Sequence, residues 1–131
     1  MEIGKKFVKE NIEELKSFDD MRFNPKAVYI SDEMKVIVAY FKPGQFIPVH
    51  TPGVDVVLCI FEGEAEVVAD DEKFRVGEKD LVVVPRGIKR GIRALSELVV
   101  LHIVQPVPSE KDHKEVHLKI ADNKFEYFPG N

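Results

Sequence analysis

The sequence predicts an antiparallel β-sandwich or β-barrel between residues 27 and 108. Short segments rich in valine, isoleucine and phenylalanine follow one another here, and turn-forming residues separate them. No helical pattern lies between them, which disfavours a parallel sheet and favours an antiparallel one. The apolar segments are KAVYI, KVIVAYF, DVVLCIF, EAEVVA, KFRV, DLVVVP and ELVVLHIV, and the turns are SDE, KPGQ, DDE, VGEK and PRGIKRG.

A short helix is expected before the strands, within residues 1–20. Val8, Ile12 and Leu15 recur at helical spacing, and Ile3 and Phe7 fall close to the same face. Lysines and glutamates occupy the opposite face. A helix of this kind packs over a face of a sheet or contributes to a dimer interface.

The last part of the chain, residues 109–131, predicts a hairpin, or an arm laid over the barrel or over a partner. In EVHLKI, apolar residues alternate with polar ones, as in a strand with one buried face. The residues ADN then offer a turn, and KFEYF alternates again. His113 and His117 lie among charged residues in this stretch, which indicates a surface position for both.

Length and composition place residues 1–131 in one globular domain. The hydrophobic fraction of 44% and the charged fraction of 32% are ordinary for a soluble protein, and 131 residues suffice for one core. The net charge of −4 gives no support to a nucleic acid or a membrane as partner. A single cysteine excludes an intrachain disulfide, and the charged N-terminus lacks the apolar segment of a signal peptide. We therefore expect a cytoplasmic protein.

Two of the predicted strands are apolar on both faces, namely residues 56–61 and 98–104. A strand that is buried on both sides needs a second cover beyond the core of its own barrel. In a small protein with a single barrel, this cover is often another subunit. The pattern therefore predicts a homodimer.

Two blocks of the sequence resemble the two motifs of the cupins, which are small barrels of jelly-roll type. They are PGQFIPVHTPGVDVVLCIFEGEAEV, from Pro43, and VGEKDLVVVPRGIKRGIRA, from Val76. The first cupin motif runs Pro-Gly, His-x-His, a glutamate and a strand ending in glycine; the second runs Gly, Pro-x-Gly, two residues and a histidine. The resemblance implies a cupin-type double-stranded β-helix over residues 27–108, with the short N-terminal helix and the C-terminal hairpin or arm added.

The chain keeps only half of the ligand positions that these motifs usually carry. Cupins that bind metal present three histidines and one carboxylate to iron, manganese, nickel or zinc. By the resemblance, His50 matches the first histidine and Asp55 matches the glutamate. Pro52 and Arg90 stand at the other two positions, and neither side chain can coordinate a metal. If His102 faces inward, it would complete a set of two histidines and one carboxylate for one divalent metal ion.

Arg90 also predicts a site without a metal. A guanidinium inside a barrel needs a partner, and Asp55 is the nearest one by motif geometry. An Arg90–Asp55 pair with His50 beside it would either close as an internal salt bridge or bind the carboxylate or phosphate of a small ligand. Cys59 shares the alternating face of Asp55, which places it inside the barrel, as a small hydrophobe or as a thiol activated by His50.

Three classes of function remain open from the sequence. The first is a barrel that binds a small anionic molecule, with Arg90, His50, Asp55 and Cys59 at the ligand. The second is a metal-dependent enzyme, a dioxygenase or an isomerase, that uses His50, Asp55 and His102. The third is a non-catalytic assembly protein with an inert cavity. The lost ligand positions disfavour the second class, and an unused polar pair in a dry barrel disfavours the third.

Overall fold

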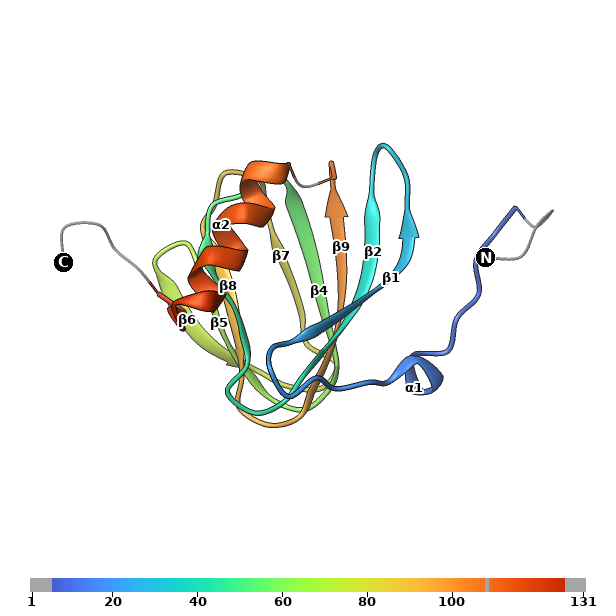
Figure 1. The fold of residues 1–131 in the computed structure, drawn as a ribbon, viewed down its shortest axis with the longest axis horizontal. Helices are drawn as coiled ribbons and strands as arrows, with labels where there is room; N and C mark the ends of the chain where they lie inside the picture. Colours follow the sequence, from blue (N-terminus) through green and yellow to red (C-terminus); the bar gives the residue numbers. More distant parts are fainter. Residues whose placement is uncertain (1–5, 108, 127–131) are drawn as a thin grey trace.

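The computed structural model describes residues 6–107 and 109–126, in which two antiparallel sheets face each other, as predicted (Figure 1). The larger sheet has the strand order β1-β2-β9-β4-β7, and the smaller one has the order β3-β8-β5-β6. The strands are β1 (Asn24–Ile30), β2 (Lys35–Phe41), β3 (Phe46–His50), β4 (Asp55–Glu62), β5 (Ala65–Ala69), β6 (Glu72–Val76), β7 (Leu81–Val84), β8 (Arg90–Ala94) and β9 (Leu98–Gln105).

Strands β3 and β8 are the two that the sequence patterns do not predict, because each contains a residue that usually interrupts a strand. Pro48 lies in the middle of β3, which is an edge strand, and an edge tolerates a residue without an N–H group. Gly91 lies in β8, where a Cβ atom would come within 2.8 Å of a side-chain carbon of Val49. Glycine therefore allows β3 and β8 to pack closely at this point.

The core lies between the two sheets. In β4, the residues that face it are not the ones that the sequence predicts. The inward residues of β4 are Val56, Leu58 and Ile60, all at most 5% exposed. Asp55 and Cys59 belong to the other set and face outward. Both alternating sets of this strand are largely apolar, so alternation alone does not say which one is inside, and a slip of one residue reverses every side chain.

The N-terminal helix is shorter than predicted. It is a single turn, α1 (Ile12–Leu15), and it begins after Asn11, whose side chain accepts a hydrogen bond from the Glu14 N–H group at 3.0 Å. Phe7 and Val8 are exposed, and Ile3 lies outside the described residues. The predicted packing over a sheet is confirmed on the outer face of β2 and β9. The side chains that make this contact are Ile12, Leu15 and Phe18.

The C-terminal segment forms a helix, α2 (Glu110–Ala121), and the predicted hairpin is wrong. A capping box starts the helix. The Ser109 hydroxyl accepts a hydrogen bond from the Asp112 N–H group at 3.1 Å, and the Asp112 carboxylate accepts one from the Ser109 N–H group at 3.3 Å. Neither α1 nor α2, the helices of the described residues, is long and apolar enough to cross a membrane.

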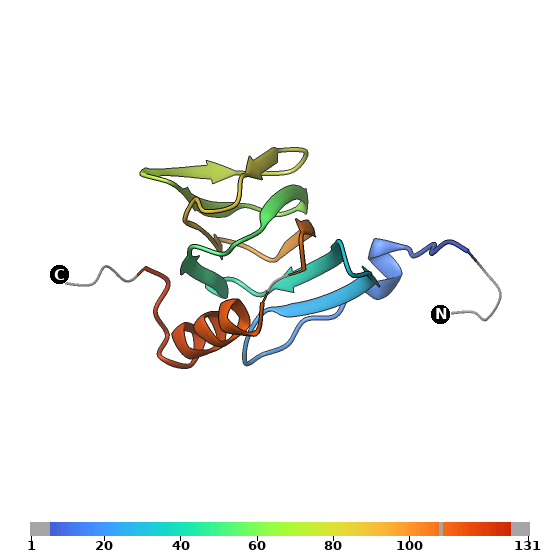
Figure 2. The same ribbon diagram turned by 90° about the horizontal axis from the view of Figure 1, so that it is seen from above.

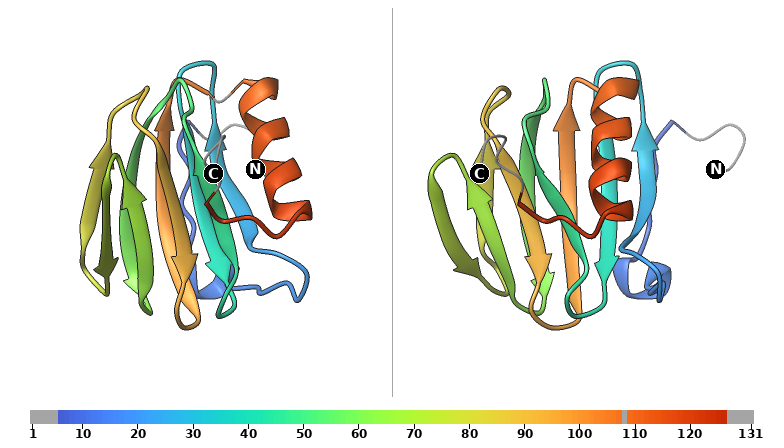
Figure 3. Two further views of the ribbon diagram at one scale, coloured as in Figure 1. Left: turned by 90° about the vertical axis from the view of Figure 1, so that its left-hand side faces the viewer. Right: turned by 60° about the vertical axis from the view of Figure 1, so that its left-hand side comes forward.

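Helix α2 nevertheless lies over the barrel, as an arm was expected to do. It runs along the open side of the two sheets, next to β3 (Figures 2 and 3). Lys119 donates a hydrogen bond from Nζ to the carbonyl of Val49 in β3 at 2.6 Å. Beyond the helix, the buried Phe125 accepts a hydrogen bond from the Val49 N–H group at 2.7 Å and packs edge to face on Phe46. These contacts hold the helix at the side of the barrel.

Candidate functional site

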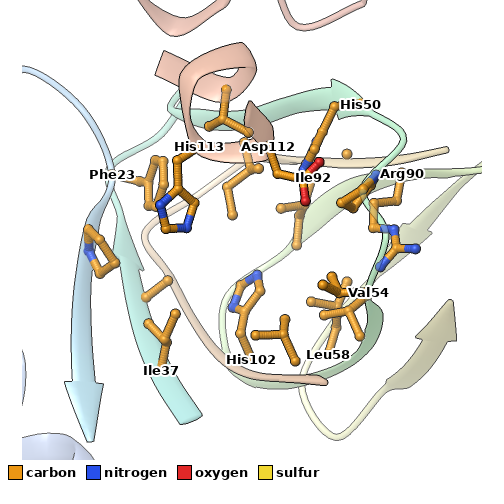
Figure 4. A pocket seen from close by; sticks show the side chains of 18 of the residues that line it. Phe23, Ile37, His50, Val54, Leu58, Arg90, Ile92, His102, Asp112 and His113 are labelled. Carbon is orange, nitrogen blue, oxygen red and sulfur yellow. The ribbon is translucent and has the colours of Figure 1, made fainter. Parts of the chain in front are cut away.

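A cavity of about 260 Å³ lies between the two sheets, at the side that α2 covers (Figure 4). Apolar side chains from both sheets form most of its wall. They include Phe23, Ile37, Ala39, Ile47, Val54, Val56, Leu58, Ile92 and Val104. The polar lining consists of Arg22, Lys35, His50, Arg90, His102, Asp112, His113 and His117. An apolar cavity with a few convergent polar groups is typical of a small-molecule site.

His50 is the last residue of β3, and its side chain faces the cavity (Figure 4). Its Nδ1 atom lies 2.8 Å from the carbonyl oxygen of Pro48, which can only accept a hydrogen bond. The ring therefore carries its proton on Nδ1 when neutral, and Nε2 is left as an acceptor. Burial lowers the pKa of His50, against the opposing effect of the Pro48 carbonyl. The imidazole is accordingly neutral at pH 7.

His102 points into the cavity from β9 (Figure 4), which resolves the orientation that the sequence leaves open. It is 8% exposed, and burial lowers its pKa to about 4, although the backbone of Val100 favours the protonated form. Its Nδ1 atom is buried and has no hydrogen-bond partner among the described residues. His102 is thus a neutral imidazole with an unused polar atom.

Arg90 lies directly opposite His50 in the β3–β8 ladder and is 6% exposed. Its Nε atom donates to the carbonyl of Ile88 at 3.2 Å, and Nη2 donates to the carbonyl of Pro85 at 2.7 Å. Nη1 is buried without a partner in the described part of the chain. Burial lowers the pKa of Arg90, against the opposing charges of Asp55 and Asp112, and a guanidinium stays charged at neutral pH. Backbone carbonyls therefore hold a buried cation beside the cavity.

Asp55 does not reach the cavity, and the predicted Arg90–Asp55 pair is wrong. Its side chain is 46% exposed and pairs with Arg86. The carboxylate accepts hydrogen bonds from the Arg86 N–H group at 2.7 Å and from Nη2 of the guanidinium at 3.1 Å. The Arg86 guanidinium lowers the pKa of Asp55. The cause is the register of β4, which turns this residue outward.

Cys59 is also outside the barrel, contrary to the prediction. It is partly buried on the outer face of β4, where its cross-strand neighbours are Leu81 and Leu101. It therefore takes no part in the cavity, and His50 does not activate it.

The mouth of the cavity holds residues that the sequence does not predict for a site. His113 and His117 are exposed, as expected, yet they line the mouth from α2. Arg22 donates from Nη1 to Nδ1 of His117 at 2.9 Å, and Lys35 lies close enough to lower the pKa of His113, after the larger effect of burial. All four histidines of the sequence thus line one cavity. The capping box Ser109–Asp112 is the signal that would have indicated this helix.

No family model and no curated protein matches the sequence. Among solved structures, a RmlC-like cupin protein from Desulfovibrio desulfuricans is 31% identical, with a TM-score of 0.69 over 76% of this chain and 97% of that one. The chain belongs to the cupin superfamily. TT1209 from Thermus thermophilus is 23% identical, with a TM-score of 0.72 over 76% of this cupin and 98% of that chain. KdgF from Halomonas sp. is 21% identical, with a TM-score of 0.63 over 75% of this chain and 90% of that one. These two show the shared fold alone.

The side chains at the cavity of this cupin do not fit a metal ion. Of the four ligand positions, only that of His50 presents a donor, since Pro52 and Arg90 have none and Asp55 faces outward. His102 adds an imidazole from the other sheet. Within residues 6–107 and 109–126, no three His, Cys, Asp or Glu side chains gather in a way that could hold a metal. The predicted set of His50, Asp55 and His102 is therefore not assembled, and the charge of Arg90 opposes a second cation nearby.

Proposed function

We propose that this cupin binds a small organic molecule with one acidic group, which contacts Arg90 while an apolar body fills the cavity. The observation that carries the proposal is the environment of Arg90. Its guanidinium is 6% exposed, its bonded partners are two neutral carbonyls, and Nη1 has no partner among the described residues. The charges of Asp55 and Asp112 act on this guanidinium, but neither carboxylate is bonded to it. Burying a cation without a bonded counter-ion is costly, and a ligand carboxylate in direct contact would lower that cost.

The charges around the cavity support an anion over a cation. Three basic side chains line it, and Asp112 is the carboxylate among the described lining residues. That carboxylate already accepts the Ser109 N–H group in the capping box. The histidines at positions 50 and 102 have lowered pKa values, so they add no charge at pH 7. The basic side chains are Arg22, Lys35 and Arg90. This excess of positive charge draws an anion toward the mouth of the cavity.

The size and the walls of the cavity define the rest of the ligand. Its volume of about 260 Å³ lies just below the usual range of ligand sites, which begins at about 300 Å³, so the ligand is small. The apolar wall favours a hydrocarbon body. His50 presents Nε2 as an acceptor, so a hydroxyl or amine near the acid group would gain a hydrogen bond there.

The geometry of the cavity does not support a metal-dependent reaction. The enzyme alternative relied on Asp55 as a ligand beside His50, and Asp55 is bonded to Arg86 on the outside of the barrel. His50 and His102 point inward from β3 and β9, whereas His113 and His117 line the mouth, and no three metal-binding side chains of the described residues come together, as catalytic metal sites usually need.

Titration calorimetry with hexanoate and 1-hexanol tests the proposal, because the two probes differ only in the acid group. We expect hexanoate to bind at least about tenfold more tightly than the alcohol, since charged hydrogen bonds contribute about 1.5 to 3 kcal/mol. Arg90→Met should remove this preference. Arg86→Met is the matched control, because Arg86 points to the outer surface and should leave binding unchanged.

Two results would overturn the proposal. One is equal affinity of the wild-type protein for the acid and the alcohol. The other is an unchanged preference for hexanoate in the Arg90→Met protein, provided that it unfolds cooperatively like the wild type.

A further inference from the structure

Two basic side chains at the mouth of the cavity lack an acidic partner. Arg22 precedes β1 and Lys35 is the first residue of β2, and both line the cavity. Both are half-buried, unlike the exposed Lys26. Within residues 6–107 and 109–126, neither side chain forms an ion pair with a carboxylate, although the same part of the chain provides acidic partners for Lys16, Lys42, Lys73, Arg86, Lys89, Arg93 and Lys119. The two unpaired cations leave a place for an anion from outside the chain.

Neighbouring side chains hold Arg22 in position. Its Nη1 atom donates a hydrogen bond to Nδ1 of His117 at 2.9 Å, and its guanidinium carbon lies 5.0 Å from the centre of the Phe23 ring. A guanidinium can only donate, so His117 is neutral in this pair and carries its proton on Nε2. The other side-chain N–H groups of Arg22 and the Nε2–H group of His117 have no partner in the described part of the chain. They are donors available to a ligand at the mouth.

Arg90 lies across the cavity from these two cations. It belongs to β8 of the smaller sheet, whereas Lys35 belongs to β2 of the larger one. Figure 4 shows Arg90 on one side of the cavity and Phe23 and Ile37 on the other. Arg22 adjoins Phe23 in the sequence, and Lys35 shares the inward face of β2 with Ile37. Apolar side chains line most of the space between. The cavity is thus positive at two ends and apolar between them.

A carboxylate suits the mouth better than a phosphate does. Phosphate groups commonly bind at the N-terminus of a helix, where backbone N–H groups are unpaired. At that end of α2 the capping box already satisfies the N–H groups of Ser109 and Asp112, and the Asp112 carboxylate adds a negative charge there. The cations that remain at the mouth are one guanidinium and one ammonium. They match the single charge and the two oxygens of a carboxylate.

We infer that the ligand is a dicarboxylate with a short apolar chain. One acid group contacts Arg90, as in the proposed function on which this inference rests, and the second contacts Arg22 and Lys35 at the mouth. The apolar chain of the ligand fills the space between the sheets. Because this chain links the two contacts, the second one forms intramolecularly and adds affinity at little further cost in entropy. An acid with a single charged group would leave one end of the cavity unused.

Titration calorimetry with linear dicarboxylates, from butanedioate to octanedioate, tests the inference. Each diacid is compared with its own monoamide, which has the same shape but only one charge. At the chain length that binds best, we expect the diacid to bind at least about fivefold more tightly than the monoamide, because charged hydrogen bonds are stronger than neutral ones.

Three variants locate the second acid group. Arg22→Met should abolish the advantage of the diacid, and Lys35→Met, which keeps the hydrogen bond between Arg22 and His117, should reduce it. Arg75→Met is the matched control, because Arg75 is an exposed residue of β6 outside the cavity, so its loss should leave the advantage unchanged. All three proteins should still prefer hexanoate to 1-hexanol, since that preference depends on Arg90.

Equal affinity for diacid and monoamide at every chain length would overturn the inference. So would an unchanged advantage of the diacid in both the Arg22→Met and the Lys35→Met proteins. If hexanoate is still preferred to the alcohol in either case, the proposed function stands without the dicarboxylate. Equal affinity of the wild type for hexanoate and the alcohol would instead contradict the proposed function, and the dicarboxylate with it.

Discussion

Arg90 and His102 reach one cavity from opposite sheets, and each has a buried nitrogen without a hydrogen-bond partner in the described residues. A buried polar group left without a partner costs about 1 to 3 kcal/mol. Two such atoms at one cavity indicate a partner that the chain itself does not supply. They also distinguish the cavity from a sealed core, in which an apolar residue would serve better at both positions.

The first prediction concerns the stability of the Arg90→Met protein without ligand. We expect its free energy of unfolding to stay within about 1 kcal/mol of the wild type or to rise, because a buried charge is replaced by an apolar side chain of similar length. Urea denaturation measures this difference. A loss of several kcal/mol would instead assign Arg90 a structural role, through its bonds to the carbonyls of Pro85 and Ile88.

The second prediction is a pH dependence of stability that comes from His102. Its pKa is about 4 in the folded protein and about 6.5 when unfolded, so the unfolded chain binds more protons between these values. The contribution of His102 to stability is complete above pH 6.5 and is lost as the pH falls to about 4, by roughly 3 kcal/mol in all. Between pH 4 and 6.5, the free energy of unfolding of the His102→Gln protein should change less steeply with pH than that of the wild type.

His117→Gln is the control for that experiment, since His117 lies at the exposed mouth. Its free energy of unfolding should change with pH as that of the wild-type protein does. If the His102→Gln protein shows the same pH dependence as the wild type, the imidazole at position 102 is not buried in the neutral form.

The third prediction separates Asp55 from the binding site. Asp55→Asn should leave the affinity for hexanoate within about twofold of the wild type, because the carboxylate pairs with Arg86 on the outer surface. Calorimetry compares the two proteins directly. A loss of affinity as large as that of Arg90→Met would place Asp55 at the ligand after all.

The fourth prediction uses the lost ligand positions. Elemental analysis of the wild-type protein, purified without a histidine tag, should find no stoichiometric divalent metal. Arg90→His should raise the affinity for Zn²⁺ by at least about tenfold, because residue 90 lies opposite His50 and the change replaces a cation with a ligand. The double variant Arg90→His, His50→Gln should lose this gain. Tightly bound metal in the wild type would refute the present description of the cavity.

The register of β4 shows where the sequence is sufficient and where it is not. Apolar segments between turns were enough to predict the double-sheet architecture and most strands. In β4, however, Val56 and Leu58 alternate with Val57 and Cys59, and both sets are apolar. Nothing local then decides which set is inside, and this one ambiguity misplaced Asp55 together with Cys59.

The C-terminal segment shows a second limit of prediction from the sequence, which concerns the spacing of apolar residues. Val116 and Ile120 are four residues apart, so they fit a strand that alternates and equally a helix with one buried face. Leu118 favoured the strand, but it is 58% exposed on the helix. The helix brings His113 to the cavity mouth, which no strand pattern could predict. The positions of His50 and Arg90 at the cavity were predictable, because the cupin motifs give them.

A crystal structure of the protein with hexanoate would show where the acidic group binds. We expect the carboxylate within hydrogen-bond distance of Nη1 of Arg90, with the alkyl chain between the sheets and directed toward Leu58. A carboxylate held only at the mouth by Arg22 or Lys35, with no alkyl chain in the cavity, would rule out Arg90 as the anchor of the acid group.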